Sequence, residues 1–301
     1  MKREHRPTRF YNTFGPHAPA LTLDDGDILV VETLDSRGRN GHMETVAAPS
    51  NPLSGPFYVR GAEPGDALEV EILELRPNRA YGYCGTSVAE HVVEPAHVRQ
   101  LPPRELAAWE VDAAAWTATL TEPDTKLGRL TLPLDPMLGC IGVAPKGGQA
   151  ISSATSAEHG GNMDYRGYRK GVTALFPVFE PGALLFVGDG HAVQGDGEIV
   201  GMGIEISMEA ELRVRVRKGA GLRWPRGYTD QYLFAVGNAR PLDQALQHAT
   251  TELLAWLEDD YGLDPVAASI LLGQCIRYDI GNVFDPAYTV VARIARALLP
   301  A

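Results

Sequence analysis

The sequence has few cysteines, no long apolar run and few cationic clusters. Its three cysteines are an odd number without Cys-x-x-Cys spacing, which argues against a disulfide framework or a cysteine-rich zinc site. No segment approaches the roughly eighteen apolar residues that a membrane span needs. The first residues carry no apolar run typical of a signal peptide. We therefore expect a cytoplasmic protein with no membrane contact.

The charge balance argues against nucleic acid as a partner. The net charge is −11, and nucleic acids attract basic surfaces. The one dense cationic stretch, 213–218, alternates with apolar residues, as on the solvated face of a strand.

Glycine and proline indicate a mainly β (α+β) fold. The chain has 32 glycines and 22 prolines, spread widely, as between many short strands. Segments 67–75 and 204–216 alternate apolar and polar residues, whereas 132–207 holds continuous apolar runs typical of strands covered on both faces. We expect a β-sandwich or barrel-like core.

The C-terminal part changes character. Apolar residues recur at helical spacing over 241–260, and Gly262 is a helix stop. Asp264 and Pro265 then form an N-cap and a first-turn proline for a second helix over 265–272, and 289–294 is a closing strand. We expect one catalytic unit over 1–301, with a β-rich core at about 20–237 and an α/β portion at about 238–301 that packs a helical pair on the sheet.

Two glycine-rich clusters carry the functional signal. They are His159-Gly-Gly-Asn162-Met-Asp164 and Gly188-Asp-Gly-His191-Ala-Val-Gln-Gly-Asp196-Gly-Glu198, about thirty residues apart. Imidazole and carboxylate groups bind divalent metals, a spare carboxylate can carry a proton, and glycine lets the backbone approach a ligand. The apolar chain between them places the clusters at the ends of buried strands. This combination predicts an enzyme site.

These residues also carry a family resemblance. Asn51-Pro-Leu-Ser-Gly-Pro-Phe-Tyr-Val-Arg-Gly-Ala-Glu-Pro-Gly-Asp66, Gly139-Cys-Ile-Gly-Val-Ala-Pro145 and the two clusters resemble the acetamidase/formamidase family in order and approximate spacing, from about residue 20 to the C-terminus. The resemblance implies hydrolysis of a short amide to carboxylate and ammonia, a mainly β fold, metal at the site and a homodimer. Relatives that open small lactams widen the substrate range.

Amide hydrolysis suggests a role for each residue. A divalent metal activates water and polarises the carbonyl, and a carboxylate then moves the proton from water to nitrogen. Zinc fits imidazole ligands, and calcium is the alternative because acids are plentiful. The metal ligands we predict are His191, His159, Asp164 and Asp66. Glu198 is the predicted general base, with Glu63 second, and either could exchange roles with an acid ligand.

The other polar residues of this region are assigned roles outside metal binding and proton transfer. Asn162 could hold the substrate through its amide or cap a turn. Asp189 and Asp196 are interpreted as turn formers, and Gln194 and Glu205 as residues that support the ligands.

Two other kinds of function were weighed against metal-dependent hydrolysis. Nucleophilic catalysis is the weaker enzyme reading, because 152–156 lacks a glycine-framed serine and Cys140 lies in an apolar strand. The alternative of another class is a non-catalytic β-sandwich that binds calcium or a small polar ligand through Asp-Gly turns.

Overall fold

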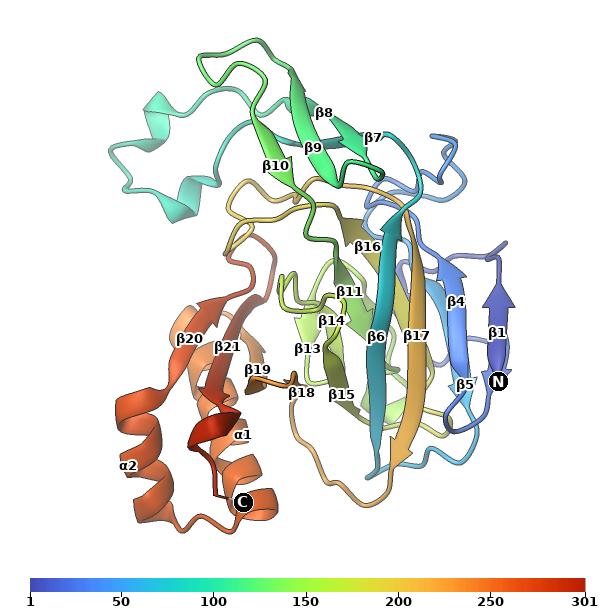
Figure 1. Cartoon of the computed structure of the whole chain (residues 1–301), viewed down its shortest axis with the longest axis vertical. Helices are drawn as coiled ribbons and strands as arrows, with labels where there is room; N and C mark the ends of the chain where they lie inside the picture. The colour runs from blue at the N-terminus through green and yellow to red at the C-terminus, as the bar shows by residue number, and fades with distance from the viewer. Residues whose placement is uncertain (301) are drawn as a thin grey trace.

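Two sheets face each other across the main core of the computed structural model, which describes residues 1–300 (Figure 1). The first has nine strands, in the order β1 (Lys2–His5), β4 (Ile28–Glu32), β17 (Met208–Arg217), β6 (Ala67–Pro77), β15 (Thr173–Pro177), β18 (Arg226–Tyr228), β19 (Tyr232–Ala239), β21 (Tyr288–Ala295) and β20 (Arg277–Ile280). The second has six, in the order β13 (Ser156–Ala157), β14 (Gly160–Asn162), β11 (Met137–Gly142), β16 (Leu185–His191), β5 (Ser54–Val59) and β3 (Leu21–Leu23).

Two smaller sheets complete the β structure of the described residues. A four-stranded sheet, β10 (Thr131–Pro133), β9 (Thr117–Glu122), β8 (Leu106–Asp112) and β7 (Tyr81–Gly85), stands at the top of Figure 1. The short strands β12 (Ile151–Ser152) and β2 (Thr13–Phe14) pair with each other. Single 3₁₀ turns cover Glu90–Val92, Val98–Gln100, Lys146–Gly148 and Arg296–Leu298. The mainly β prediction is confirmed.

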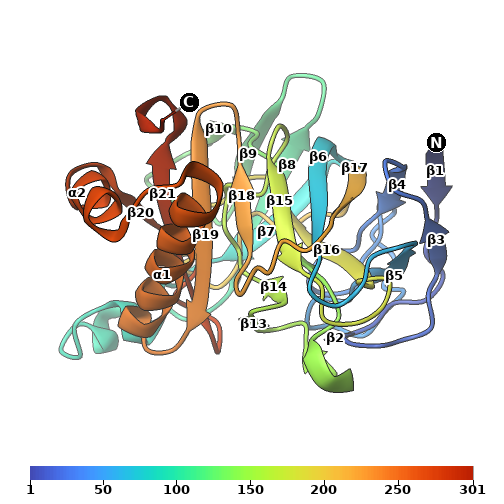
Figure 2. The same cartoon turned by 90° about the horizontal axis from the view of Figure 1, so that it is seen from below.

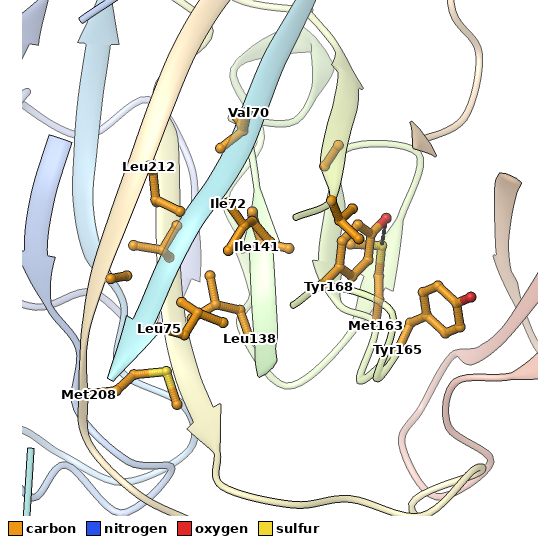
Figure 3. Packing of buried hydrophobic residues seen from close by; sticks show 14 of the residues in the cluster. Val70, Ile72, Leu75, Leu138, Ile141, Met163, Tyr165, Tyr168, Met208 and Leu212 are labelled. Carbon is orange, nitrogen blue, oxygen red and sulfur yellow. Dashed lines mark hydrogen bonds between the residues drawn. The ribbon is translucent and has the colours of Figure 1, made fainter. Parts of the chain in front are cut away.

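The core between the two large sheets follows from the sequence pattern. In β6 and β17 alternate side chains are buried, and Val70, Ile72 and Leu212 face Leu138 and Ile141 of β11 (Figure 3). Every residue of β11, β15 and β16 is buried, as the continuous apolar runs predicted. The outward face of β17 is solvated, as the alternation of 213–218 indicated.

The C-terminal elements are close to their predicted bounds. The helices are α1 (Leu242–Tyr261) and α2 (Pro265–Cys275), and β21 is the predicted closing strand. The Asp264 carboxylate accepts hydrogen bonds from the backbone N–H groups of Val266 and Ala267, and Gly262 ends α1 with a φ of 62°. No helix of the described chain has both the length and the apolar character to cross a membrane.

Helix α1 packs on the large sheet beside β19, and α2 lies farther out (Figure 2). Ala249, Leu253 and Trp256 of α1 form one buried cluster with Leu175 of β15 and Ala235 of β19. Because β19 pairs along its whole length with β21, the C-terminal portion extends the nine-stranded sheet.

Candidate metal and active site

Three neighbouring strands of the six-stranded sheet bring the polar clusters together. In β11 Cys140 lies opposite Asn162 of β14 on one side and Gly188 of β16 on the other. Asp164 follows β14 by two residues. Gly188-Asp-Gly-His191 lies inside β16, so the turn interpretation of Asp189 is wrong. Gly188 and Gly190 alternate with Asp189 and His191 in this buried strand, so the two functional side chains are only two residues apart.

His191 is the centre of the resulting cluster. Its ring is fully buried, and its Nδ1 donates to Oε1 of Gln194 at 2.8 Å. Nε2 lies 3.0 Å from Oε1 of Glu205 and 3.5 Å from Oδ1 of Asp189, but makes no well-directed hydrogen bond. Nε2 therefore faces carboxylates, and either a proton or a metal ion on this nitrogen would place a positive charge between them.

Gln194 fixes the orientation of the His191 ring through its hydrogen bond with Nδ1. Its Nε2 donates to the backbone carbonyl of Asp164 at 2.6 Å, which leaves its Oε1 as the acceptor for His191. A partner of this kind is what a metal-binding imidazole commonly has on its other nitrogen.

Burial and neighbouring charges shift the pKa values of the acids around His191. Burial, together with the neighbouring acids, raises the pKa of Asp189 to about 6 and the pKa values of Asp164 and Glu198 well above the usual range. Burial also acts to raise the pKa of Glu205, but His191 and the N–H of Ser36 outweigh it and the pKa is lowered. For His191, burial acts to lower the pKa, but Glu205 and Asp189 raise it overall.

A second group of polar residues holds Asp164 in place. Asn162 donates to Oδ2 of Asp164 at 2.8 Å and to Oδ2 of Asp285 at 2.6 Å, and its own oxygen accepts from Asn51 and Cys140. The amide of Asn162 is therefore already bonded on both ends within the protein. Asp285 comes from the loop between β20 and β21, so the C-terminal portion completes the cluster.

The backbone of this cluster is strained. Asp164, Asp189 and Glu198 have φ values of 43°, 53° and 47°, and Ser50 and Asn51 on the nearby wall also have positive φ. Non-glycine residues occupy this region at a cost of about 1–3 kcal/mol each, and such residues gather at functional sites. Five of nine such residues in the described chain lie here, which supports a functional assignment.

Glycine at position 139 makes the close approach of two acids possible. A Cβ there would collide with Oδ1 of Asp164 and would lie 2.7 Å from Oδ2 of Asp189. Gly203 has the same role beside His191, because a Cβ would lie 2.5 Å from Cγ of the ring. Both positions need glycine because a Cβ would overlap a side chain of the cluster, whereas neither glycine has a left-handed φ.

The donor set fits a metal ion. Two groups have ligand atoms that lie within 4.8 Å of one another, Asp164–His191–Glu198 and Asp189–His191–Glu205. Nε2 of His191 and the Oδ1 atoms of Asp164 and Asp189 are buried without a hydrogen-bond partner. Buried polar atoms are rarely left unpaired, and a cation would satisfy all three. These groups could therefore hold a metal ion.

A cavity of about 280 Å³ opens onto the cluster. Its acidic wall is formed by Asp189, Glu198, Glu205 and Asp285. Ser36, Ser50 and Asn51 also line it. A small polar molecule in this cavity would contact the candidate ligands directly.

The structure does not bring the other predicted site residues to this cavity. Glu63 is exposed, and Asp66 accepts hydrogen bonds from the N–H groups of Glu63 and Gly219 and from Nζ of Lys218. Asp66 precedes β6, whereas Glu205 lies beyond the other end of that eleven-residue strand. At about 3.3 Å per residue, the two acids are roughly 30 Å apart.

His159 is also outside both candidate metal groups. Its ring is fully buried, packs 5.2 Å from the ring of Phe14, and has no hydrogen-bond partner on either nitrogen. Burial lowers its pKa to about 4, so the ring is neutral. The structure thus places this imidazole in an aromatic contact and in neither candidate metal group.

Cys140 touches the cluster without the properties of a nucleophile. It is fully buried and donates to the oxygen of Asn162 at 2.7 Å. Burial raises the pKa of its thiol well above the usual value, and Asp189 and Asp164 raise it further. A thiol in this state is not the reactive thiolate form.

Sequence reasoning missed three acids of the cavity wall. Asp189 had been assigned to a turn, Glu205 to a supporting position, and Asp285 to no role. Glu205 and Asp285 are close to the site only through long-range pairing, as in the isolated bridges of Glu205 with His191 and with Tyr83. The Gly-Asp-Gly-His spacing was the one local signal for Asp189.

A family model described as the Acetamidase/Formamidase family matches residues 2–148 and 143–246. The chain belongs to the acetamidase/formamidase family. It is 30% identical to the acetamidase of Mycolicibacterium smegmatis over 77% of the chain and 71% of that protein. It is 26% identical to the formamidase of Methylophilus methylotrophus over 69% of the chain and 63% of that protein. The chain thus spans between three fifths and three quarters of the length of these family members.

Solved structures of family members are similar over almost the whole chain. An acetamidase from Yersinia enterocolitica has a TM-score of 0.87 at 30% identity, covering 100% of this chain and 94% of that one. A predicted acetamidase/formamidase from Thermoanaerobacter tengcongensis has a TM-score of 0.86 at 28% identity, covering 99% and 97%. A γ-lactamase from Delftia acidovorans shares the fold, with a TM-score of 0.61 at 21% identity, covering 97% and 90%.

Proposed function

We propose that the protein hydrolyses a small amide to carboxylate and ammonia with the aid of a divalent metal ion. The observation that carries the proposal is a set of buried atoms without hydrogen-bond partners, Nε2 of His191 and Oδ1 of Asp164 and Asp189, beside a cavity whose wall includes Asp189. Family membership supports the reaction class, and the acetamidase and formamidase relatives support short linear amides. The γ-lactamase shares only the fold, and small lactams stay a secondary expectation.

His191, Asp189 and Glu205 are the proposed ligands, and Asp164 is a further candidate. Glu205 and Asp189 offer the shortest approaches to Nε2 of His191, 3.0 and 3.5 Å. When bound, a divalent metal lowers the pKa of water and polarises the amide carbonyl. Zinc suits an imidazole ligand, and calcium remains the alternative because carboxylates dominate the set. His159 and Asp66 are left out of this set because neither belongs to a group of ligand atoms around His191, and Asp66 is already bonded to Lys218.

Glu198 is proposed as the general base. It faces the cavity, and its Oε1 accepts from the N–H of Gly203 at 3.1 Å, 3.9 Å from Nε2 of His191. That hydrogen bond orients the carboxyl group. Burial raises its pKa, which suits a group that must take a proton from water and deliver it to the leaving nitrogen. Glu63, exposed and remote, is not part of this proposal.

Asn162 is proposed as a positioning residue. Its amide joins Asp164 to Asp285 and also bonds Asn51, so it spans the β14 wall and the loop after β20. Since Asp285 belongs to the C-terminal portion, we also propose that the whole chain acts as one catalytic unit.

Two properties of the whole protein are proposed with it. We infer a homodimer, as the family resemblance implies. Val266 and Ile270 of α2, 68% and 65% exposed and one helical turn apart, are candidate contacts.

We infer a cytoplasmic location, which is compatible with three unpaired thiols. Sedimentation of V266D/I270D beside wild type tests the homodimer, and cell fractionation tests the location.

Ammonia release measured before and after chelation tests the proposed reaction. We expect formamide or acetamide to be hydrolysed by the purified protein, activity to disappear with the metal, and activity to return when zinc or calcium is added back. Full activity in a preparation shown by elemental analysis to be metal-free would contradict the metal. No turnover on amides or lactams by the loaded protein would favour a binding module.

A further inference from the structure

The cavity has a single cationic side chain on its wall. Among the described residues that line it, Arg37 stands against the four acids named above. An arginine facing a small polar cavity is a recognition element for anionic groups, because its planar fork can bind both oxygens of a carboxylate.

The guanidinium of Arg37 is free to bind a ligand. Within residues 1–300 it forms no hydrogen bond or ion pair, and it lies 5.3 Å from the ring centroid of Tyr83. Arg79, close by, has the opposite state. It is buried and bonded to Asp35, Tyr81 and Glu205, so its guanidinium serves the fold.

The backbone around Arg37 is fixed to the candidate metal site. The N–H of Ser36 donates to Oε2 of Glu205 at 3.2 Å, and the N–H of Arg37 donates to Oδ1 of Asp35 at 3.0 Å. Arg37 therefore follows directly on the residue that contacts a proposed ligand. The backbone from which its side chain extends is thereby fixed beside that ligand.

The cavity is larger than a simple amide requires. Its 280 Å³ corresponds to roughly nine water-sized groups at about 30 Å³ each, whereas acetamide has four non-hydrogen atoms. Space remains for a longer acyl chain, and Arg37, Ser36 and Ser50 line the cavity together with the acids.

We propose that Arg37 binds a carboxylate on the acyl side of the substrate, so that the protein prefers amides of dicarboxylic acids to neutral short amides. This rests on the proposed amide hydrolysis and names the substrate class. The amide end meets Glu198 beside the candidate metal site, and the carboxylate end meets the guanidinium. A single negative charge suits this arrangement, because the nearby acids would repel a more highly charged group.

The test compares succinamate, which carries a carboxylate, with butyramide, a neutral amide with the same number of carbon atoms. For wild type we expect kcat/KM to be at least about tenfold higher for succinamate. R37M should lower succinamate kcat/KM by about 10- to 100-fold, the scale of a charge-assisted bidentate contact, and change butyramide by less than about threefold. R37K, which keeps the charge but loses the fork, should fall between them.

Arg39 provides a matched control. Its guanidinium lies over the same ring, 5.4 Å from the centroid of Tyr83, but Arg39 does not line the cavity. R39M should therefore leave both substrates within about twofold of wild type. Succinate binding by calorimetry, which needs no turnover, should weaken in R37M and not in R39M.

Several outcomes would overturn the assignment. Equal losses on both amides in R37M would place Arg37 on the amide group itself, and equal effects of R37M and R39M would mean a general charge effect. Hydrolysis of butyramide without any preference for succinamate would refute the substrate class and leave the proposed reaction standing. Absence of all amide hydrolysis, together with unchanged succinate binding in R37M, would refute both.

Discussion

Two aspartates in similar sequence settings, Asp66 and Asp189, end in opposite states. Each follows a glycine and each is almost fully buried, 5% and 2% exposed. Asp66 accepts from two backbone N–H groups and from Lys218, and these outweigh burial and lower its pKa. Oδ1 of Asp189 has no partner, and burial raises its pKa to about 6. Burial alone therefore does not mark a functional acid; a buried oxygen without a partner does.

The largest expected effect is on turnover, and it should distinguish Glu198, beside Asp189, from Glu63, beside Asp66. Glu198→Gln should reduce turnover by about 10²–10⁴, the usual scale for a lost general base, and should keep the metal and the fold. Glu63→Gln, on the exposed turn beside Asp66, should stay within about twofold. The measurement is ammonia release with metal content for both variants. Loss of the metal in Glu198→Gln would make Glu198 a ligand instead.

The next effect concerns the space that lets two acids meet. Gly139→Ala should weaken metal binding by about 10- to 100-fold, since its Cβ would displace Asp164 and Asp189, and changes beside ligands cost on this scale. Gly195→Ala is the matched control, because a Cβ there meets nothing within 4 Å and its φ is not left-handed. Metal titration of the two variants measures the difference. Equal affinities would show that the acids do not hold the metal.

A third prediction uses pH to compare the two buried histidines. His159 is neutral in the fold with a pKa of about 4, against about 6.5 unfolded. The unfolded chain therefore takes up a proton first, and stability is full above pH 6.5 and falls as the pH drops from 6.5 to 4, by about 3 kcal/mol. His159→Met should remove that part of the pH dependence in denaturant unfolding and leave metal content unchanged. Metal loss in this variant would restore His159 as a ligand.

The smallest expected effect is at the satisfied aspartate. Asp66→Asn should lower the free energy of unfolding by about 1–2 kcal/mol at pH 7 through weakened hydrogen bonds, because the ion pair with the 65% exposed Lys218 adds little. Since the fold lowers the pKa of Asp66, the difference from wild type should shrink as the pH falls below the usual range of aspartate. Urea unfolding at two pH values measures this. A loss of activity without a loss of stability would contradict the structural role.

Local patterns explain what the sequence could predict. The period of α1 and the Asp264 cap depend on neighbours in the chain, and both helices were predicted close to their observed bounds. The apolar runs predicted fully buried strands, without their bounds. His191, Glu198 and Asp164 were recognisable because they are clustered with glycines.

Long-range pairing explains what the sequence could not predict. Glu205 and Asp285 join the site only when β16 and the β20–β21 loop are brought together, and neither stands in a distinctive local motif. Asp189 was misread because an Asp-Gly pair has the same letters in a turn and in a buried strand. The similarity of Asp66 to a ligand was equally local, and its partners Lys218 and Gly219 come from far along the chain.

The most direct test of the metal site is anomalous diffraction from crystals of the active protein, recorded on both sides of the zinc absorption edge and, for calcium, at long wavelength. We predict one strong peak about 2.0–2.6 Å from Nε2 of His191 and from carboxylate oxygens of Asp189 and Glu205. A peak beside His159 or Asp66, or an active crystal with no peak at His191, would contradict the account.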